Sequence, residues 1–145
     1  MKKLEIFYED IQPLKLQKTA LKKHINNLII SELKEMGEIS IVFCSDTYLL
    51  SINEQYLNHD YYTDIITFDY GDNDIISGDL FISLDRVIDN AKTFNVEKSK
   101  ELFRVIFHGI LHLIGYNDKS REEKKLMREK ENQCLNEVEF NGMKL

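Results

Sequence analysis

The segment from residue 98 to residue 114 constrains the fold more than any other part of this chain. Its apolar residues recur at the spacing of an α-helix, and Gly115 follows as a stop. A helix of this kind has an apolar side, which folding must bury against a second layer of structure. Two histidines, His108 and His112, interrupt the apolar run. The segment therefore predicts a central helix that is largely buried and carries two imidazoles.

The remaining sequence mixes strand and helix patterns. Alternating or β-branched runs predict four strands, at residues 3–9, 39–44, 64–70 and 75–83. Helical spacing and capping residues predict four further helices, at residues 15–36, 46–57, 84–94 and 121–138. Gly37 is expected to stop the first of them, and Gly78 to mark a bulge or a close backbone contact. The predicted fold is α+β, a single domain spanning residues 1–145, with a small, mixed, about four-stranded sheet packed with about five helices.

Composition narrows the classes of protein to which the chain can belong. Of its 145 residues, 43% are hydrophobic and 30% are charged, which is typical of a globular protein. No signal-peptide pattern and no apolar run of about 20 residues is found, which predicts a cytoplasmic protein without a membrane partner. The two cysteines lie far apart and are expected to be free thiols. The formal net charge of −6 argues mildly against nucleic acid, whose partners usually have a strongly basic face.

The two histidines, Gly115 and Asp118 have the spacing of a metal site. Residues four apart on a helix lie on one face, so His108 and His112 can both reach one Zn²⁺ at ~2.0–2.1 Å. Gly115 allows a positive φ at the helix end, and Asp118 can then arrive from the turn as a third ligand. Three protein ligands are typical of catalytic zinc. The alternative, two core histidines beside an ordinary helix stop, would require other partners for both imidazoles.

The spacing H-x-x-x-H-x-x-G-x-x-[H/D] also occurs in the metzincin metalloproteases. Those enzymes carry a glutamate directly after the first histidine, and this glutamate is their general base. Here that position is Gly109, which has no side chain. A metalloprotease-like hydrolase is therefore the third and least favoured of the functions considered.

Three motifs, in the same order, resemble those of the YbeY family of bacterial rRNA maturation factors and endoribonucleases. The chain has "HGILHLIGYND", "INEQYLNHDYYTDIITF" and "SGDLFIS", where the family has H-G-x-L-H-L-x-G-Y-D-H, L-N-x-x-Y-R-x-x-D-x-P-T-D-V-L-S-F and G-D-I-x-I-S. The resemblance implies one divalent metal ion, with Zn²⁺ as the first choice, held by His108, His112 and Asp118. It also implies a single-strand-specific endoribonuclease acting on ribosomal RNA of the small ribosomal subunit, in rRNA maturation and ribosome quality control.

Three positions depart from the family pattern. Asp118 stands where the family usually has histidine; carboxylate remains a zinc ligand but favours harder ions more than imidazole does. Leu57 stands at the family's arginine, and an aliphatic side chain cannot bind a phosphate. Tyr62 stands at the family's proline, which implies a local change in a loop.

Other residues of these motifs leave alternatives open. The candidates for contact with substrate, which can equally close turns or brace strands, are Asn53, Asp64, Thr67 and Asp79. Basic residues within 119–130 can meet RNA phosphates or belong to a solvated helix face. The sequence identifies no general base. The second function considered is a ribosome-assembly binding factor with a structural metal and little catalysis, which Leu57 and the acidic net charge favour.

Overall fold

A mixed sheet of four strands in the order β1-β2-β4-β3 forms the frame of the computed structural model, which describes residues 2–140 and 143. The strands are β1 (Lys3–Glu9), β2 (Glu35–Cys44), β3 (Ile65–Asp69) and β4 (Ile75–Ser83). The helices are α1 (Lys18–Ser31), α2 (Asp46–Leu57), α3 (Leu84–Phe94), α4 (Lys98–Ile114) and α5 (Arg121–Leu135). Strand β2 pairs in parallel with β1 and β4, and β3 pairs with β4 as an antiparallel hairpin. The predicted α+β fold class is confirmed.

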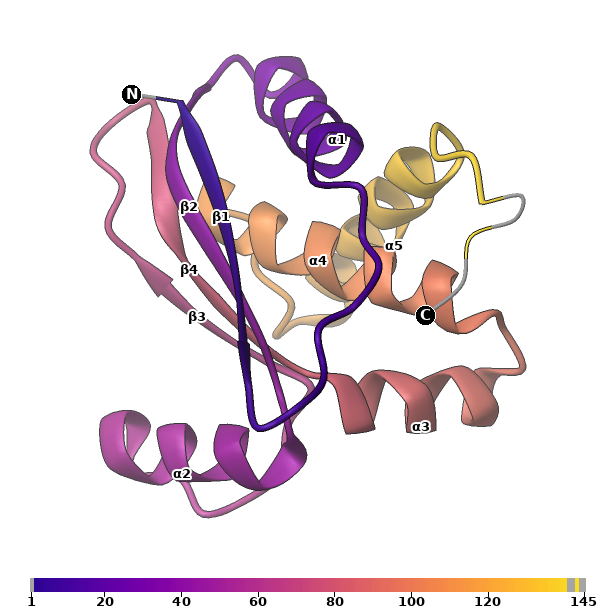
Figure 1. Ribbon diagram of the computed structural model, residues 1–145. Helices are drawn as coiled ribbons and strands as arrows, with labels where there is room; N and C mark the ends of the chain where they lie inside the picture. The colour runs from indigo at the N-terminus through magenta and orange to yellow at the C-terminus, as the bar shows by residue number, and fades with distance from the viewer. Residues whose placement is uncertain (1, 141–142, 144–145) are drawn as a thin grey trace.

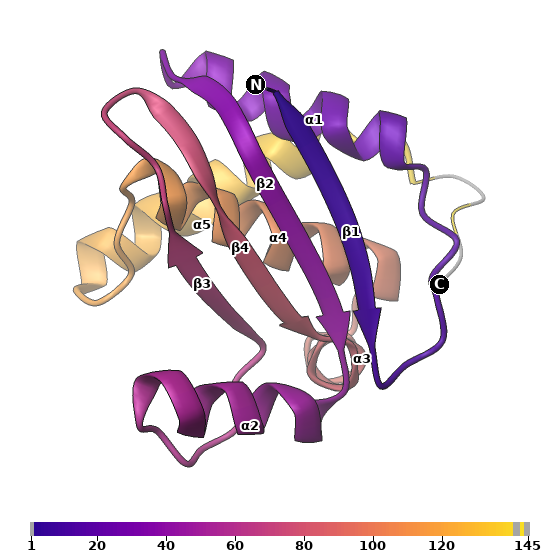
Figure 2. The same ribbon diagram turned by 60° about the vertical axis from the view of Figure 1, so that its left-hand side comes forward.

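The sheet carries helices on both faces. Figure 1 shows α1, α4 and α5 on one side of the sheet, and Figure 2 shows α2 across the lower end of the other. Helix α4 supplies much of the core, with these buried apolar residues: Leu102, Phe103, Val105, Ile106, Phe107, Ile110, Leu111 and Leu113. Each such side chain contributes about 1.5–3 kcal/mol when fully buried, so α4 is held firmly on the sheet. No helix among the described residues is both long and apolar enough to cross a bilayer.

The first helix is shorter than predicted, and the prediction for Gly37 is wrong. Helix α1 ends at Ser31, and Gly37 lies within β2. Leu33 continues the helical spacing but is 89% exposed and has a φ of 60°, whereas Met36 is 2% exposed. Pairing of Met36 with Ile76 of β4 buries that side chain in the core, and this long-range contact outweighs the local helical pattern.

Predictions that depend on short-range chemistry fare better. Ser45 and Ser83 accept hydrogen bonds from backbone N–H groups at the starts of α2 and α3, and Ser120 forms the predicted capping box with Glu123. Gly78 marks a close contact, because a Cβ there would lie 2.4 Å from the carbonyl oxygen of Phe68. The bulge lies in β2, where the register with β4 shifts after Met36. Helix α5 ends at Leu135, three residues before its predicted end.

Gly109 is a point where α4 comes very close to the sheet. A Cβ at this position would lie 2.6 Å from Cδ1 of Ile65 and 2.7 Å from Cδ2 of Leu80. Glycine is therefore required at position 109 by packing, and a glutamate there would point into the sheet. The close packing of α4 on the sheet therefore leaves no room for the glutamate that metzincins carry at this position.

We expect Gly109→Ala to lower the free energy of unfolding by roughly 1–3 kcal/mol, because the added methyl overpacks this contact. Helix propensity alone predicts the opposite sign, since alanine is favoured over glycine by about 1 kcal/mol in a helix interior. Urea unfolding followed by circular dichroism measures the difference. Asn27→Ala on the exposed side of α1 is the control and should be close to neutral; a stabilised Gly109→Ala variant would contradict the packing argument.

Candidate metal centre

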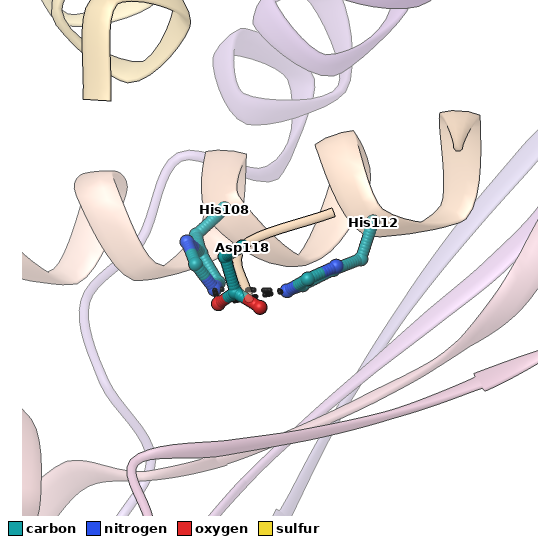
Figure 3. A group of neighbouring side chains, drawn as sticks. All are labelled: His108, His112 and Asp118. Carbon is teal, nitrogen blue, oxygen red and sulfur yellow. Dashed lines mark hydrogen bonds and ion pairs between the residues drawn. The ribbon is translucent and has the colours of Figure 1, made fainter. Parts of the chain in front are cut away.

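His108, His112 and Asp118 come together at the C-terminal end of α4 (Figure 3). The Nε2 atoms of the two histidines lie 3.0 Å apart. An Oδ2 oxygen of Asp118 lies 3.2 Å from Nε2 of His108 and 3.4 Å from Nε2 of His112. The structure thus brings all three predicted residues into one group.

Local backbone geometry explains how Asp118 reaches the two histidines. Gly115 ends α4 with a φ of 125°, and its N–H donates to the carbonyl groups of Leu111 and His112. The N–H of Tyr116 also donates to Leu111, which folds the chain back toward the helix. The predicted positive φ at Gly115 is confirmed. Because α5 begins directly after Ser120, the turn that carries Asp118 is short and fixed at both ends.

Each imidazole is oriented through its other nitrogen. Nδ1 of His108 lies 2.7 Å from Oε2 of Glu131, and Nδ1 of His112 lies 2.9 Å from the carbonyl oxygen of Tyr116. A carboxylate and a carbonyl can only accept, so these contacts assign the proton of each neutral ring to Nδ1. Both Nε2 atoms then present lone pairs toward Asp118.

This donor set fits a cation. Two Nε2 lone pairs 3.0 Å apart beside a carboxylate oxygen repel one another unless positive charge lies among them. The separations of 3.0, 3.2 and 3.4 Å are close to the edge of about 3.3 Å expected for a tetrahedron with zinc–ligand bonds of ~2.0–2.1 Å. Two imidazoles and one carboxylate are also ordinary zinc ligands. The group can therefore hold a metal ion.

A polar stripe runs along α4 behind these donors. Glu101, Arg104, His108 and His112 recur at helical spacing, and their side chains are 2%, 13%, 18% and 26% exposed, so the stripe opens toward the metal group. Arg104 forms a two-pronged ion pair with Glu101 at 2.8 and 2.7 Å and bonds Glu131 at 3.1 Å. Hydrogen bonds thus run without a break from Glu101 through Arg104 and Glu131 to the imidazole of His108.

The network keeps a negative charge behind His108. Burial works against ionisation of Glu131, but His108 and Arg104 outweigh it and lower the pKa of the carboxyl below its ordinary value. Burial likewise opposes the charge on Arg104, but Glu101 and Glu131 raise its pKa. Asp64 also lies 3.9 Å from Arg104. Arg104 thus faces three carboxyl groups, and Nη1 of Arg128 also lies 3.6 Å from Oε1 of Glu131. With Asp118 counted, four carboxyl groups stand against two arginines near the donor atoms, and this balance favours a cation there.

The turn is also anchored from outside α4. The hydroxyl of Tyr116 donates to Glu32, just after α1, and Nζ of Lys130 on α5 lies 3.1 Å from the same carboxylate. Lys130 also lies 5.7 Å from the centre of the Tyr116 ring. Because the carbonyl of Tyr116 orients His112, these contacts connect α1 and α5 to the metal group.

A cavity of about 350 Å³ opens in front of the three residues. Of the candidates from the sequence, Asn53, Asp64 and Thr67 line it, whereas Asp79 lines a separate hollow with Tyr70. Leu57 is in its wall, so the family's arginine position faces the site but carries no charge. Cys44 and Cys134 are free thiols outside the group, as expected.

Glu131 was not identified from the sequence, although a signal for it exists. Met127 and Leu135 are buried and lie four residues before and after it, so Glu131 interrupts the apolar side of a highly charged helix. A lone carboxylate on such a side needs a buried partner. The sequence could not show that the partners come from α4.

Comparison with known proteins bears on the whole chain. The family model of endoribonuclease YbeY matches residues 6–139. The endoribonuclease YbeY of Parabacteroides distasonis is 52% identical over 129 residues, covering 89% of this chain and 91% of the relative. That of Bacteroides thetaiotaomicron is 50% identical, covering 88% and 93%. A solution structure from Thermotoga maritima is similar in fold, with a TM-score of 0.64 and 28% identity over 90% of this chain and 87% of that one.

We expect Glu131→Gln to lower the free energy of unfolding by about 1–3 kcal/mol at neutral pH in the presence of a chelator, because it removes the charge that faces Arg104 and His108. Glu129→Gln, on the exposed side of the same helix, is the matched control and should change stability by less than about 0.5 kcal/mol. Urea unfolding of the two variants gives the comparison.

The same difference should depend on pH. Since folding lowers the pKa of Glu131, its contribution is present above the ordinary value of 4.5 and is lost as the pH falls through the lower, folded-state value. The gap between wild type and Glu131→Gln should therefore narrow on acidification. A gap that widens below pH 4.5 would contradict the assignment of an ionised carboxylate.

Proposed function

The chain belongs to the endoribonuclease YbeY family, and on this basis we propose that it is a metal-dependent endoribonuclease that cleaves single-stranded RNA. The observation that carries the proposal is the convergence of His108, His112 and Asp118 at the floor of an accessible cavity. The relatives named endoribonuclease cover about nine-tenths of the chain, which supports the same class of hydrolase.

In this proposal His108, His112 and Asp118 hold one divalent ion, and Zn²⁺ suits two imidazoles and a carboxylate. Such an ion, when bound, supplies a Lewis acid that polarises a phosphoryl oxygen and lowers the pKa of water. Glu131 and the carbonyl of Tyr116 keep both Nε2 atoms turned toward the ion. Partners of this kind fix the tautomer of a ligating histidine and raise its basicity.

We assign the protein to the cytoplasm, to ribosomal RNA of the small subunit and to ribosome quality control. The support is the resemblance of the three ordered motifs to the YbeY family. The acidic net charge remains an objection, because Glu101 and Glu131 are buried together with Arg104 and this cluster accounts for only one net negative charge of the six.

A second candidate function is a ribosome-assembly binding factor in which the metal is structural. One observation favours it: among the described residues that line the cavity, none is lysine or arginine. Two arginines lie near the site, and both are already paired: Arg104 with Glu101 and Glu131, and Arg128 with Glu131. A phosphate in this cavity therefore meets no lysine or arginine among the described lining residues, which argues against RNA cleavage there.

His112→Ala should reduce cleavage of single-stranded RNA by at least about a hundredfold, because a bound ion supplies several kcal/mol of charge stabilisation in the transition state. The assay uses protein of verified metal content and a labelled oligoribonucleotide. His24→Ala, on α1, is the control and should cleave at the wild-type rate. Equal activity in wild type and a folded His112→Ala variant would reject the endoribonuclease proposal and favour the ribosome-assembly binding factor.

Asp118→Asn removes the anionic ligand and should weaken Zn²⁺ binding by at least about a hundredfold. Loss of a residue that only orients a ligand costs up to about a hundredfold, and loss of the ligand itself should cost no less. Asp118→His should restore most of the affinity, because imidazole is an equally good zinc ligand. Competition with a chromophoric chelator measures both constants without reference to activity. If Asp118→Asn binds zinc as wild type does, Asp118 is not a ligand.

A further inference from the structure

Two aromatic rings form part of the wall of the metal-facing cavity. His59 and Tyr61 stack with ring centres 5.0 Å apart and an angle of 22° between planes, and the Tyr61 hydroxyl lies 3.0 Å from Nδ1 of His59. We call these two residues the aromatic pair. Both line the same cavity as His108, His112 and Asp118. Tyr61 is nevertheless 56% exposed, so the pair presents ring surface to the cavity and to solvent.

The backbone of the aromatic pair is fixed by one buried residue. Asn53 is 2% exposed, and its side-chain amide donates to the carbonyl of Tyr61 at 2.8 Å. The backbone carbonyl of Asn53 accepts a hydrogen bond from the N–H of His59 at 3.1 Å. Asn53 therefore closes the loop after α2, which is the structural role foreseen for it as an alternative. The pair is held in position before any ligand arrives, which lowers the entropic cost of binding to it.

The neighbouring Tyr62 has a different partner, a cation. The guanidinium of Arg86 lies 4.9 Å from the centre of the Tyr62 ring, and Arg86 is itself bonded to Asp46. Arg86 therefore lies against one side of the Tyr62 ring, which is still 50% exposed. What distinguishes the aromatic pair is its place: both residues line the metal-facing cavity, whereas Tyr62 is not among the residues that line it.

The other properties of the cavity indicate what the aromatic pair binds. With no lysine or arginine among its described lining residues, its walls do not compensate a chain of phosphates. Every nucleobase, however, has an apolar π-face, and stacking of one base on an aromatic side chain contributes enough to weaken binding about tenfold or more when the ring is removed. A base in a duplex has both faces covered by its neighbours, so a fixed stacking surface selects unpaired bases.

We propose that the aromatic pair is a stacking platform for one unpaired base of the RNA strand whose phosphate lies at His108, His112 and Asp118. This inference rests on the proposed function and adds how the site distinguishes single-stranded from paired RNA. Because stacking tolerates any base, it predicts a preference for unpaired structure with little preference for sequence.

Binding of a short single-stranded oligoribonucleotide to the zinc-loaded protein tests the platform. The strand carries 2′-O-methyl groups to slow cleavage and one 2-aminopurine, whose fluorescence falls on stacking. Tyr61→Ala should bind about tenfold more weakly and lose the quenching. Tyr61→Phe keeps a ring and should bind within about twofold of wild type. Tyr70 is a tyrosine of similar exposure (64%) in a separate hollow, so Tyr70→Ala is the matched control and should leave binding and quenching unchanged.

A series of abasic strands identifies the stacked position. For wild type, removing the base at one position should weaken binding about tenfold, and for Tyr61→Ala the same removal should have little further effect. Equal losses in both proteins at every position, or unaltered binding by Tyr61→Ala, would overturn the platform. A separate result would reject the proposed function: wild type would show no zinc-dependent cleavage of unmodified RNA. A wild-type protein that binds no strand would reject both.

Discussion

A buried helix with a polar stripe is the constraint from which the rest of this structure follows. Helix α4 packs against the sheet and against α5, so each polar group of the stripe must find a partner or lose the free energy of its hydration. Glu101, Arg104 and Glu131 satisfy one another, and Glu131 also accepts from His108. At the exposed end of the stripe the Nε2 atoms of His108 and His112 face the carboxylate of Asp118, and a cation would satisfy all three groups. The same hydrogen bonds from Glu131 therefore fix the position of α5 and orient a residue of the metal group.

The sequence predicted features that depend on neighbouring residues better than features that depend on contacts between residues far apart in the chain. The histidine pair, the positive φ of Gly115 and the capping box at Ser120 are set within a few residues, and the structure agrees with the predicted geometry. The end of α1 was mispredicted because Met36 is buried by pairing with Ile76, far along the chain. Glu131 escaped notice for the same reason, since its partners lie on another helix. Gly109 was noticed as a missing base, and its contacts with β3 and β4 show that the sheet excludes any side chain there.

The loop between α2 and β3 and the turn after α4 reach the cavity by different means. Asn53 holds the loop through two hydrogen bonds, whereas Gly115 and the start of α5 hold the turn. The two walls therefore share few of the contacts that fix them. Substitutions among the loop's exposed residues can alter what the cavity accepts while the donor atoms of the turn keep their places.

The anchoring of Tyr116 has a consequence for how the molecule holds together. Its hydroxyl reaches Glu32 beside α1, Lys130 of α5 reaches the same carboxylate, and its carbonyl orients His112. Elements from the first and last thirds of the chain thus meet at the residue that shapes the ligand turn. A ligand that binds only the assembled group stabilises the folded state by mass action, so an ion held by His108, His112 and Asp118 would stabilise the turn from which Tyr116 contacts Glu32. The supply of metal would then help to set the lifetime of the protein as well as its activity.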